Sequence, residues 1–372
     1  MHMSQTKWLT RLFVVVLIGG LLLAACGGGS AEDAAAPVDD AAPAESAGPV
    51  INSAGVELPD DAAPLERQVV RQPSRESPWM TWDGSVYDVN LGDQFAWSDS
   101  CVRPDKQYEP QPNLCTEWEV SEDGLTWTFK MDPDRVWTDG TPITAKDMVF
   151  TLQRYSRPDY DFEWFYSMMG IENWGAVVSG EVPYEELGAE VVDDYTFTIT
   201  TERPVPFLIK IMADVWVVPE HVVQDRDNDG TWALDEENYV FAGPYKLVEY
   251  NRGVNMIFQA NEMYTGPFPP LLEEIEVIFM EPETRFNAYK SDELDYIGGG
   301  YEQDLPPSAM AEISASPELQ EQLISWPNFI TYYLFFDTFN EPFDNLKVRQ
   351  AISHAVDRDL IVNGPLKDQS VA

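Results

Sequence analysis

The chain of 372 residues is poor in the side chains on which metal centres and nucleic-acid surfaces depend. It has three histidines and three cysteines, and no cluster of them has the spacing of a zinc site. Only 23 Lys and Arg stand against 64 Asp and Glu, so the net charge is -41 at pH 7. A field of this sign repels phosphates and anionic lipid headgroups. We therefore exclude a zinc enzyme and a nucleic-acid-binding protein.

Catalytic motifs are also missing from the sequence. It contains no G-x-S-x-G, no P-loop and no H-E-x-x-H. Beyond the N-terminal segment only His221 and His354 could act as a histidine base, and His221 lies beside Pro219, which favours a structural histidine. Carboxylates are abundant, but nothing singles out two of them as a glycosidase pair. We expect no enzymatic activity.

The N-terminal segment has the features of a secretory signal. Lys7 and Arg11 precede an apolar run over 12–23 that is too short to span a bilayer comfortably. The sequence Leu-Ala-Ala-Cys then resembles the bacterial lipobox, which implies removal of residues 1–25 and a lipid anchor on Cys26. The alternative is an ordinary cleaved signal with an incidental cysteine. We expect an extracytoplasmic lipoprotein on the outer face of the cell membrane, in the periplasm if an outer membrane is present.

The segment after the signal reads as a tether. From Gly27 to about Pro64 the chain consists mainly of Ala, Pro, Gly, Ser and acidic residues, without a basic residue. Such a composition cannot bury enough apolar surface to fold. We predict a flexible acidic linker over residues 26–66 and a folded body that begins near Arg67.

Two cysteines remain if Cys26 carries lipid. Cys101 and Cys115 lie in a compartment that is oxidising on this interpretation, so we predict a disulfide between them. Closing this loop would add about 3 kcal/mol to the stability of the fold. Two free buried thiols are the alternative, because a sequence does not report the separation of Cα atoms.

Apolar periodicity predicts a mixture of strands and helices. Alternating apolar residues around an acidic Asp-Gly turn indicate a hairpin, and a capping box at Thr144 and Asp147 indicates the start of a helix. The predicted elements are a hairpin over 118–129, a helix over 145–157, a strand over 195–199, a helix from Pro282, a strand over 294–297 and a helix over 344–362. Strict βαβ alternation is missing, so the residues favour an α/β or α+β fold with more than one lobe.

Several ordered motifs resemble one known family. The residues from Leu114 to Arg154 are similar to the signature region of bacterial family 5 extracellular solute-binding proteins, the peptide, dipeptide and nickel receptors of ABC importers. Further similar motifs are Val218-Pro219-Glu220-His221, Gly243-Pro244-Tyr245-Lys246-Leu247, Glu281 to Ile297, and Pro342 to Asp359. The resemblance extends over most of the chain from about Gln68.

The resemblance implies an α/β fold of the type II periplasmic-binding-protein class, whose two lobes close on a ligand. It places a discontinuous first lobe at 67–100 and 213–315, and an inserted subdomain at 101–212. Residues 316–372 form the start of an incomplete second lobe, with a first strand at 332–338. Family members usually continue well beyond this point, so we expect a C-terminally truncated receptor, either a truncated gene product or a piece of a longer receptor.

One motif does not belong to that family pattern. The segment from Asp225 to Glu236 matches the calcium-loop pattern D-x-D-x-D-G-x5-E at every specified position. Calcium takes hard oxygen ligands, which the side chains of Asp225, Asp227, Asp229 and Glu236 and the carbonyl of Thr231 would supply. The alternative is a solvated acidic turn. We predict bound Ca²⁺ and no organic cofactor.

The family resemblance also suggests where a ligand would bind. Loops that end first-lobe strands and the strand that crosses to the second lobe supply Trp79, Tyr301, Tyr333 and Asp337 as candidate ligand-binding residues. We expect a monomeric substrate-binding lipoprotein that passes oligopeptides or a related small solute to ABC permease subunits. The alternatives are a secreted carbohydrate-binding or glycan-active protein, and a truncated calcium-stabilised surface lipoprotein without transport activity.

Overall fold

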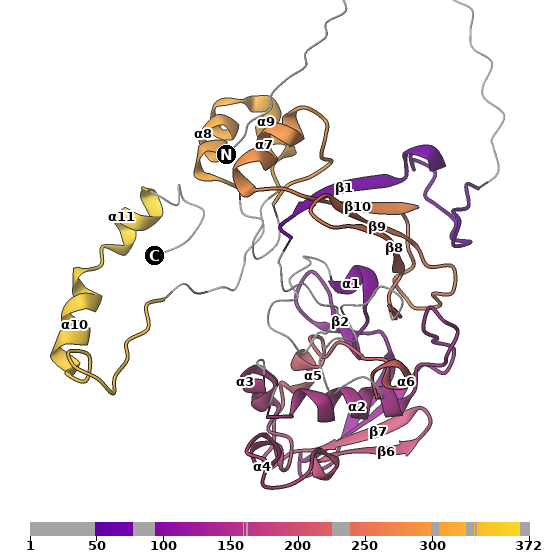
Figure 1. Ribbon diagram of the computed structural model, residues 1–372, viewed down its shortest axis with the longest axis vertical. Coiled ribbons are helices and arrows are strands. Elements are labelled where there is room, and N and C mark those ends of the chain that lie inside the picture. The colour runs from indigo at the N-terminus through magenta and orange to yellow at the C-terminus, as the bar shows by residue number, and fades with distance from the viewer. Residues whose placement is uncertain are drawn as a thin grey trace, which may run out of the picture. The chain divides into compact units, whose positions relative to one another are not determined.

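The structure is a computed structural model that describes residues 49–76, 94–158, 160, 163–224, 239–298, 305–324, 331 and 333–364 (Figure 1). The chain divides into residues 1–47 and a second unit, residues 48–372, and every described residue belongs to the second unit. None of the described helices is both long and apolar enough to cross a membrane.

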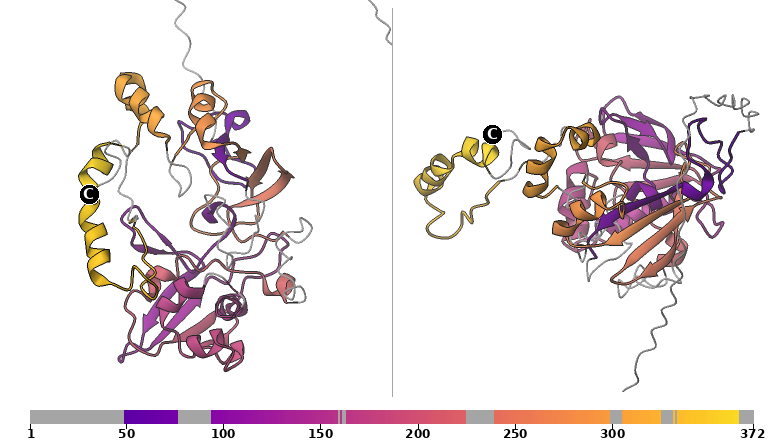
Figure 2. Two further views of the ribbon diagram at one scale, coloured as in Figure 1. Left: turned by 60° about the vertical axis from the view of Figure 1, so that its left-hand side comes forward. Right: turned by 90° about the horizontal axis from the view of Figure 1, so that it is seen from above.

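The first sheet combines strands from distant parts of the chain. Its order is β1-β10-β9-β8, with bounds Val69–Ser74 for β1, Tyr245–Asn251 for β8, Asn255–Ala260 for β9 and Glu274–Phe279 for β10. β1 is parallel to β10, and the other neighbours are antiparallel. In Figures 1 and 2 the indigo β1 lies beside the orange strands. Chain segments 67–100 and 213–315 therefore share this sheet.

The second sheet is antiparallel and has the order β4-β5-β7-β6. Its strands are Cys115–Val120 (β4), Thr126–Met131 (β5), Ala189–Asp193 (β6) and Thr196–Thr200 (β7). Alternate residues face a core, as period-two patterning requires. Trp127, Phe129, Phe197 and Ile199 are buried there, and the rings of Phe129 and Phe197 stack with their centroids 4.9 Å apart. The predicted hairpin and the predicted strand over 195–199 are both present.

Helix α2 (Ala145–Tyr155) packs against β6 and β7. It begins with the predicted capping box, in which the Asp147 carboxylate accepts hydrogen bonds from the Thr144 N–H at 2.8 Å and the Thr144 hydroxyl at 3.1 Å. Met148, Leu152 and Tyr155 are buried on one face. Burial raises the pKa of Asp147, although the bonds from Thr144 oppose this effect.

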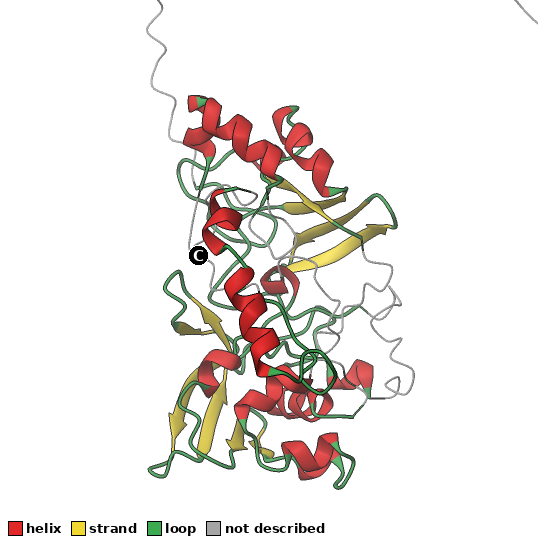
Figure 3. Cartoon of the chain, turned by 90° about the vertical axis from the view of Figure 1, so that its left-hand side faces the viewer, coloured by secondary structure: helices red, strands yellow, loops and turns green. Residues whose placement is uncertain are grey.

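The remaining elements are short (Figure 3). The further strands are β2 (Val102–Pro104) and β3 (Pro110–Pro112). Three 3₁₀ turns are η1 (Leu65–Arg67), η2 (Ser167–Met169) and η3 (Tyr184–Glu186). The further helices are α1 (Gln94–Trp97), α3 (Glu163–Tyr166), α4 (Trp174–Val178), α5 (Leu208–Ile211), α6 (Glu220–Val223), α7 (Pro282–Lys290), α8 (Pro307–Ala315), α9 (Pro317–Gln322), α10 (Leu346–Ala355) and α11 (Arg358–Asn363).

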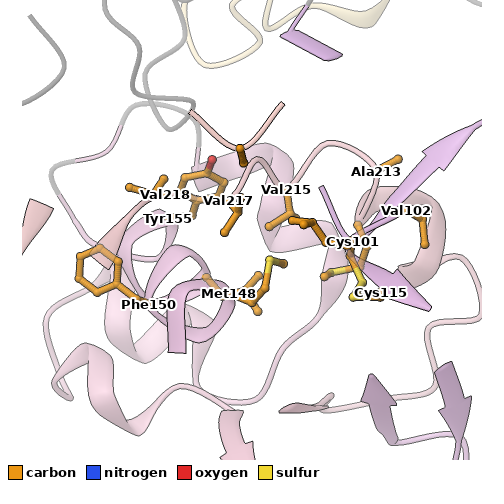
Figure 4. Close-up of a cluster of buried hydrophobic side chains, with 14 of the residues drawn as sticks. Cys101, Val102, Cys115, Met148, Phe150, Tyr155, Ala213, Val215, Val217 and Val218 are labelled. Atoms are coloured by element: carbon orange, nitrogen blue, oxygen red, sulfur yellow. A yellow bond between two sulfur atoms is a disulfide. The ribbon is translucent and has the colours of Figure 1, made fainter. Parts of the chain in front are cut away.

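The structure contains a disulfide between Cys101 and Cys115, whose Cα atoms are 4.7 Å apart. Figure 4 shows it among apolar side chains that include Val215 and, from α2, Met148. Both cysteines are completely buried, and the Cys115 N–H donates to the Cys101 carbonyl at 2.9 Å. The disulfide therefore joins the start of β2 to the start of β4 inside the core.

The structure corrects the C-terminal boundary of the predicted linker. Residues Ile51 and Glu57 form a β-bridge, and the Asn52 side chain donates to the Pro270 carbonyl at 2.7 Å. Asn52 also accepts from the Val56 N–H at 2.9 Å, and Leu58 is 5% exposed. The segment thus packs before Arg67. The polar composition of the segment did not indicate this packing, because the contacts come from two residues, Asn52 in its turn and the buried Leu58.

Two predicted strands are also corrected. Residues 294–297 are irregular, because the Asp295 carboxylate accepts from the Arg71 N–H at 2.7 Å and so occupies the edge of β1. The described residues of the predicted strand over 332–338, from Tyr333 onward, are extended without a strand partner. An alternating apolar pattern marks a segment suited to a sheet, but a strand needs a neighbour to pair with.

The predicted helix over 344–362 is two helices, α10 and α11. Asn345, rather than Asp344, caps the first, since its side chain accepts from the Lys347 N–H at 2.9 Å. Asp357 interrupts the run, because its carboxylate accepts from the Leu360 N–H at 2.9 Å and so begins a new helix. The sequence pattern predicts one continuous helix over 344–362, in which Asp357 would be an interior residue.

Candidate functional site

Aromatic side chains from four separate segments surround a small cavity, which we call the aromatic pocket. Its volume is about 20 Å³, room for one water molecule. The lining residues are Trp97, Ser98, Trp137, Trp216, Val217, Val218, Pro219, Tyr239, Val240, Phe241 and Ala242. None of them carries a charged side chain, so this wall offers apolar and aromatic contact together with main-chain groups.

Main-chain hydrogen bonds hold the four segments together. The Gly243 N–H donates to the Trp97 carbonyl at 3.1 Å, and the Val217 N–H donates to the Asp99 carbonyl at 3.0 Å. The Thr138 N–H donates to the Phe241 carbonyl at 3.0 Å, and the Thr138 hydroxyl accepts from the Phe241 N–H at 2.9 Å. Hydrogen bonds between main-chain groups therefore fix the positions of the segments that line the pocket.

Gly243 permits the closest of these approaches. A Cβ atom there would lie 2.5 Å from the Trp97 carbonyl carbon and 2.7 Å from the Ser98 nitrogen, distances that real Cβ atoms do not adopt. The Asn261 side chain donates to the Gly243 carbonyl at 2.9 Å and so holds the following peptide group of the same residue. A larger residue would push α1 away from the segment that follows Tyr239.

A buried ion pair lies behind the pocket. The Arg135 guanidinium donates to the Asp99 carboxylate, and both side chains are excluded from solvent. The Asn113 side chain also donates to Asp99 at 2.9 Å, and Arg135 lies over the Tyr264 ring, 4.5 Å from its centroid. Charged groups survive burial only when they are paired in this way. The pair connects the segment after α1 with the start of the Trp137 turn.

His221 borders the pocket on α6. Its Nε2 atom is 2.8 Å from the Asp139 carboxylate, and its ring centroid is 6.3 Å from that of Trp137. The pKa of Asp139 is lowered, because bonds from the Thr141 N–H and His221 outweigh the opposing effect of burial.

The start of α6, which carries His221, is held by Asp147, which accepts from the Glu220 N–H at 3.1 Å. The contacts of His221 are those of a positioned structural side chain.

Two of the predicted ligand-binding residues are described, and neither lines the aromatic pocket. Tyr333 is 66% exposed, and its ring lies edge to face with Phe335 at 4.7 Å. Asp337 accepts from the Asn340 side chain at 2.7 Å and from the Phe339 N–H at 3.0 Å, and these bonds lower its pKa. Asp337 therefore organises its own turn.

The other predicted site residues lie outside the described residues. They are Cys26, Trp79, Tyr301 and the calcium-loop residues Asp225, Asp227, Asp229, Thr231 and Glu236. Among the residues that the structure describes, no group of three or more His, Cys, Asp or Glu side chains could hold a metal ion.

Sequence reasoning missed the aromatic pocket, although signals for it were present. Trp137 lies in the Trp-x-Asp-Gly motif, and Gly243 opens the Gly-Pro-Tyr-Lys-Leu motif. A glycine within a motif marks a close approach of two backbones, here that of residue 243 to Trp97. The identity of the approaching segment is a tertiary fact, which no local pattern supplies.

Comparison with known proteins identifies the family. The model of bacterial extracellular solute-binding proteins, family 5 Middle, matches residues 109–372. The periplasmic oligopeptide-binding protein OppA of Haemophilus influenzae is 29% identical over 267 residues, which are 70% of this chain and 48% of the relative. The dipeptide-binding protein DppE of Bacillus subtilis is 26% identical over 268 residues, 70% of this chain and 46% of the relative.

Solved structures give the same assignment. Haemophilus influenzae OppA, crystallised with the peptide RPPGFSPFR, is 26% identical, has a TM-score of 0.67, and covers 80% of this chain against 58% of its own. The Escherichia coli murein tripeptide binding protein MppA has a TM-score of 0.69 at 24% identity and supports the fold alone. The fold is thus of the type II periplasmic-binding class, and the chain spans about half the length of the curated relatives it matches. It belongs to family 5 of the bacterial extracellular solute-binding proteins.

Proposed function

We propose that this protein is the substrate-binding component of an ABC importer and captures peptides outside the cytoplasm. The observation that carries the proposal is the family match over residues 109–372. Relatives named for oligopeptides and dipeptides, aligned over 70% of this chain, support the substrate class. A binding role also agrees with a sequence that contains no recognisable catalytic motif.

We propose that the residues around the aromatic pocket form an apolar wall of the ligand site and that the half-buried Tyr239 makes the contact, because the cavity itself has room for one water molecule only. Trp137 and Phe241 are buried and set the shape of this wall, whereas Tyr239 is half-buried at its surface. Aromatic rings give a large contact area with few side-chain torsions to fix, which suits ligands of varied sequence. The main-chain bonds through Gly243 and Thr138 keep the wall in place before a ligand arrives.

Titration of intrinsic fluorescence tests this assignment. We expect mixed tripeptides to pentapeptides to change the tryptophan emission saturably, while mono- and oligosaccharides leave it unchanged. Tyr239→Ala should weaken peptide binding about tenfold, the equivalent of one lost aromatic contact. Trp164→Ala, at an exposed aromatic residue outside the pocket, is the matched control. Saturable binding of sugars without peptides would favour the carbohydrate alternative instead.

We further propose that Cys26 is lipidated and that the lipid holds the protein on the outer face of the membrane. The support is the Leu-Ala-Ala-Cys motif after a short apolar run. We expect the native protein in the membrane fraction, with a lipid-modified N-terminal peptide that begins at Cys26, and Cys26→Ser in the soluble fraction. A Cys26→Ser protein that stays in the membrane fraction contradicts the anchor.

Calcium binding at residues 225–236 also remains our proposal, supported by the complete match to the D-x-D-x-D-G-x5-E pattern. A ligand that binds only the folded chain stabilises it by RT ln(1 + c/Kd), where c is the free ligand concentration, so the melting temperature rises with the calcium concentration. We expect a higher melting temperature in calcium than in chelator, and no such difference for Glu236→Gln. Equal melting temperatures for the unaltered protein in both solutions would refute the site.

A further inference from the structure

Among the residues that the structure describes, β4 pairs with a strand on one side only and so forms an edge of the second sheet. The Ser121 N–H donates to the Thr126 carbonyl at 2.9 Å, which sets the alternation of paired and unpaired residues along the β4-β5 ladder. In an antiparallel pair, residues between the hydrogen-bonded positions turn their main-chain groups outward. Trp118 and Val120 occupy those positions, opposite Phe129 and Trp127. Their N–H and C=O groups therefore point away from β5.

Two other edges in the described part of the chain, those of β1 and β6, are obstructed. At β1 the Asp295 carboxylate accepts from the Arg71 N–H, and the Asp295 N–H donates to the Arg71 carbonyl at 2.9 Å. At β6 the register shifts between Val191 and Asp193, a bulge that interrupts the edge. The edge of β4 has its irregularity at Cys115, before the open positions begin.

A hollow of about 370 Å³ lies against β4 and β5. Its lining residues are Pro112, Thr116, Glu117, Trp118, Glu119, Thr128 and Lys130. The Lys130 ammonium is 2.8 Å from the Glu117 carboxylate, which leaves Glu119 as the excess charge on this surface. The hollow shares no residue with the aromatic pocket.

Side chains along the edge alternate in character. Glu117 and Glu119 lie on the face that carries Thr128 and Lys130, whereas Trp118 and Val120 lie on the opposite face with Phe129 and Trp127. Val120 is 48% exposed. A strand added to this edge would find carboxylates beside its residues on one face and apolar groups beside those on the other.

We propose that the β4 edge binds an extended polypeptide segment in which basic and apolar residues alternate, by adding it to the sheet as a fifth strand. Main-chain hydrogen bonds at Trp118 and Val120 would provide affinity, and the alternation would provide selectivity. A second copy of this chain is disfavoured at the same edge, because an antiparallel β4 pair would bring glutamates against glutamates. This site does not depend on the proposed importer function.

Fluorescence anisotropy with the full chain and a labelled peptide, acetyl-Thr-Lys-Val-Lys-Val-Lys-Thr-amide, tests the proposal. The peptide of the same composition with its lysines and valines in separate blocks should bind about tenfold more weakly, because it matches only one face. The counterpart with glutamate in place of lysine should not bind. N-methylation of the amides on one edge of the peptide should abolish binding, and methylation on the other edge should not.

Protein variants separate this site from general attraction to an acidic chain. Glu117→Lys with Glu119→Lys should invert the preference toward the glutamate peptide. The matched control, Glu185→Lys with Glu190→Lys, makes the same change of net charge at exposed positions on and beside β6 and should leave the affinity unchanged. Equal binding of the alternating and block peptides, equal loss in both double variants, or indifference to N-methylation would overturn the proposal.

Discussion

Aromatic side chains are buried in the two sheets but exposed in the segment from Tyr333 to Asn363. In the sheets Phe129 and Phe197 are completely buried and stack on each other. In the C-terminal segment Phe335 is 86% exposed and Phe339 is 92% exposed. Helices α10 and α11 contain no buried residue, although α10 is well capped. Both regions therefore contain aromatic residues and local signals of regular structure, but only the sheets bury their aromatic side chains.

The difference shows what a local pattern determines. Capping, periodicity and turn residues specify where α10 and α11 begin and end, but helices this short with no buried residue gain little stability from their own hydrogen bonds. Burial needs a second surface, and the described residues do not supply one to Phe335 or Phe339. The second sheet obtains one from α2, and the inward side chains of both sheets belong to the buried apolar cluster. Stability should thus reside in the sheets, and four experiments sharpen or break this comparison.

Breaking the buried ion pair should have the largest effect. Arg135→Ala leaves the Asp99 carboxylate buried without its cation, which costs about 3–5 kcal/mol of unfolding free energy. Urea denaturation measures the loss. Asp99→Asn with Arg135→Met, which removes both charges, should restore most of the stability, whereas Lys130→Ala at an exposed pair should change nothing measurable. A small loss in Arg135→Ala would place the stability elsewhere.

Removal of the disulfide should have the next largest effect. Cys101→Ala with Cys115→Ala releases a loop with a sequence separation of 14 residues, and chain entropy then predicts a loss of about 3 kcal/mol. Denaturant titration under oxidising conditions gives the value. Reductant should leave the native protein intact at low denaturant, because both sulfur atoms are buried. Rapid labelling of the thiols in the folded protein would contradict that burial.

Crowding at Gly243 should cost less. Gly243→Ala places a Cβ atom 2.5 Å from the Trp97 carbonyl carbon, so the backbone must shift, at about 1–3 kcal/mol. Gly175→Ala is the control within α4, because its Cβ atom meets nothing and alanine favours a helix, with a gain of about 0.5–1 kcal/mol. Equal denaturation midpoints for the two variants would show that the pocket tolerates the shift.

The smallest change in stability is expected in the C-terminal segment. Phe335→Ser with Phe339→Ser should alter the unfolding free energy by less than about 0.5 kcal/mol, since both rings already face solvent. Binding of the dye ANS should fall in the same variant, because exposed apolar surface is lost. A destabilisation as large as that of Phe129→Ala would mean that these rings are buried in solution, and it would end the comparison.

The elements that the sequence predicted correctly depend on neighbours along the chain. The hairpin of β4 and β5 follows from alternation around a turn, and α2 follows from Thr144 and Asp147. The errors occur where a distant residue decides the outcome. Asp295 accepts a hydrogen bond from the Arg71 N–H, and its segment is irregular where a strand was predicted. Asn52 donates to the Pro270 carbonyl, so the end of the predicted linker is packed.

The candidate site was harder to predict than the fold. Tyr333 and Asp337, predicted from the family's arrangement of strands, do not line the aromatic pocket and stay predictions. The pocket arises where residues 97, 138, 217 and 241 meet, and their sequence separations contain no periodicity to detect. Motifs such as Gly-Pro-Tyr marked one side of each contact, and only the tertiary structure identified the other.

The pairing of β1 with β10 has a consequence for the order of folding. Val69 pairs with Glu274, roughly 200 residues later in the chain, so this contact closes a long loop at a considerable entropic cost. The hairpin of β4 and β5 needs only a short turn and can form within microseconds of its synthesis or translocation. The first sheet must wait until β10 has emerged, and contacts of such high order slow folding. We therefore expect the hairpin of β4 and β5, next to the disulfide, to form first, and β1 to pair with β10 afterwards.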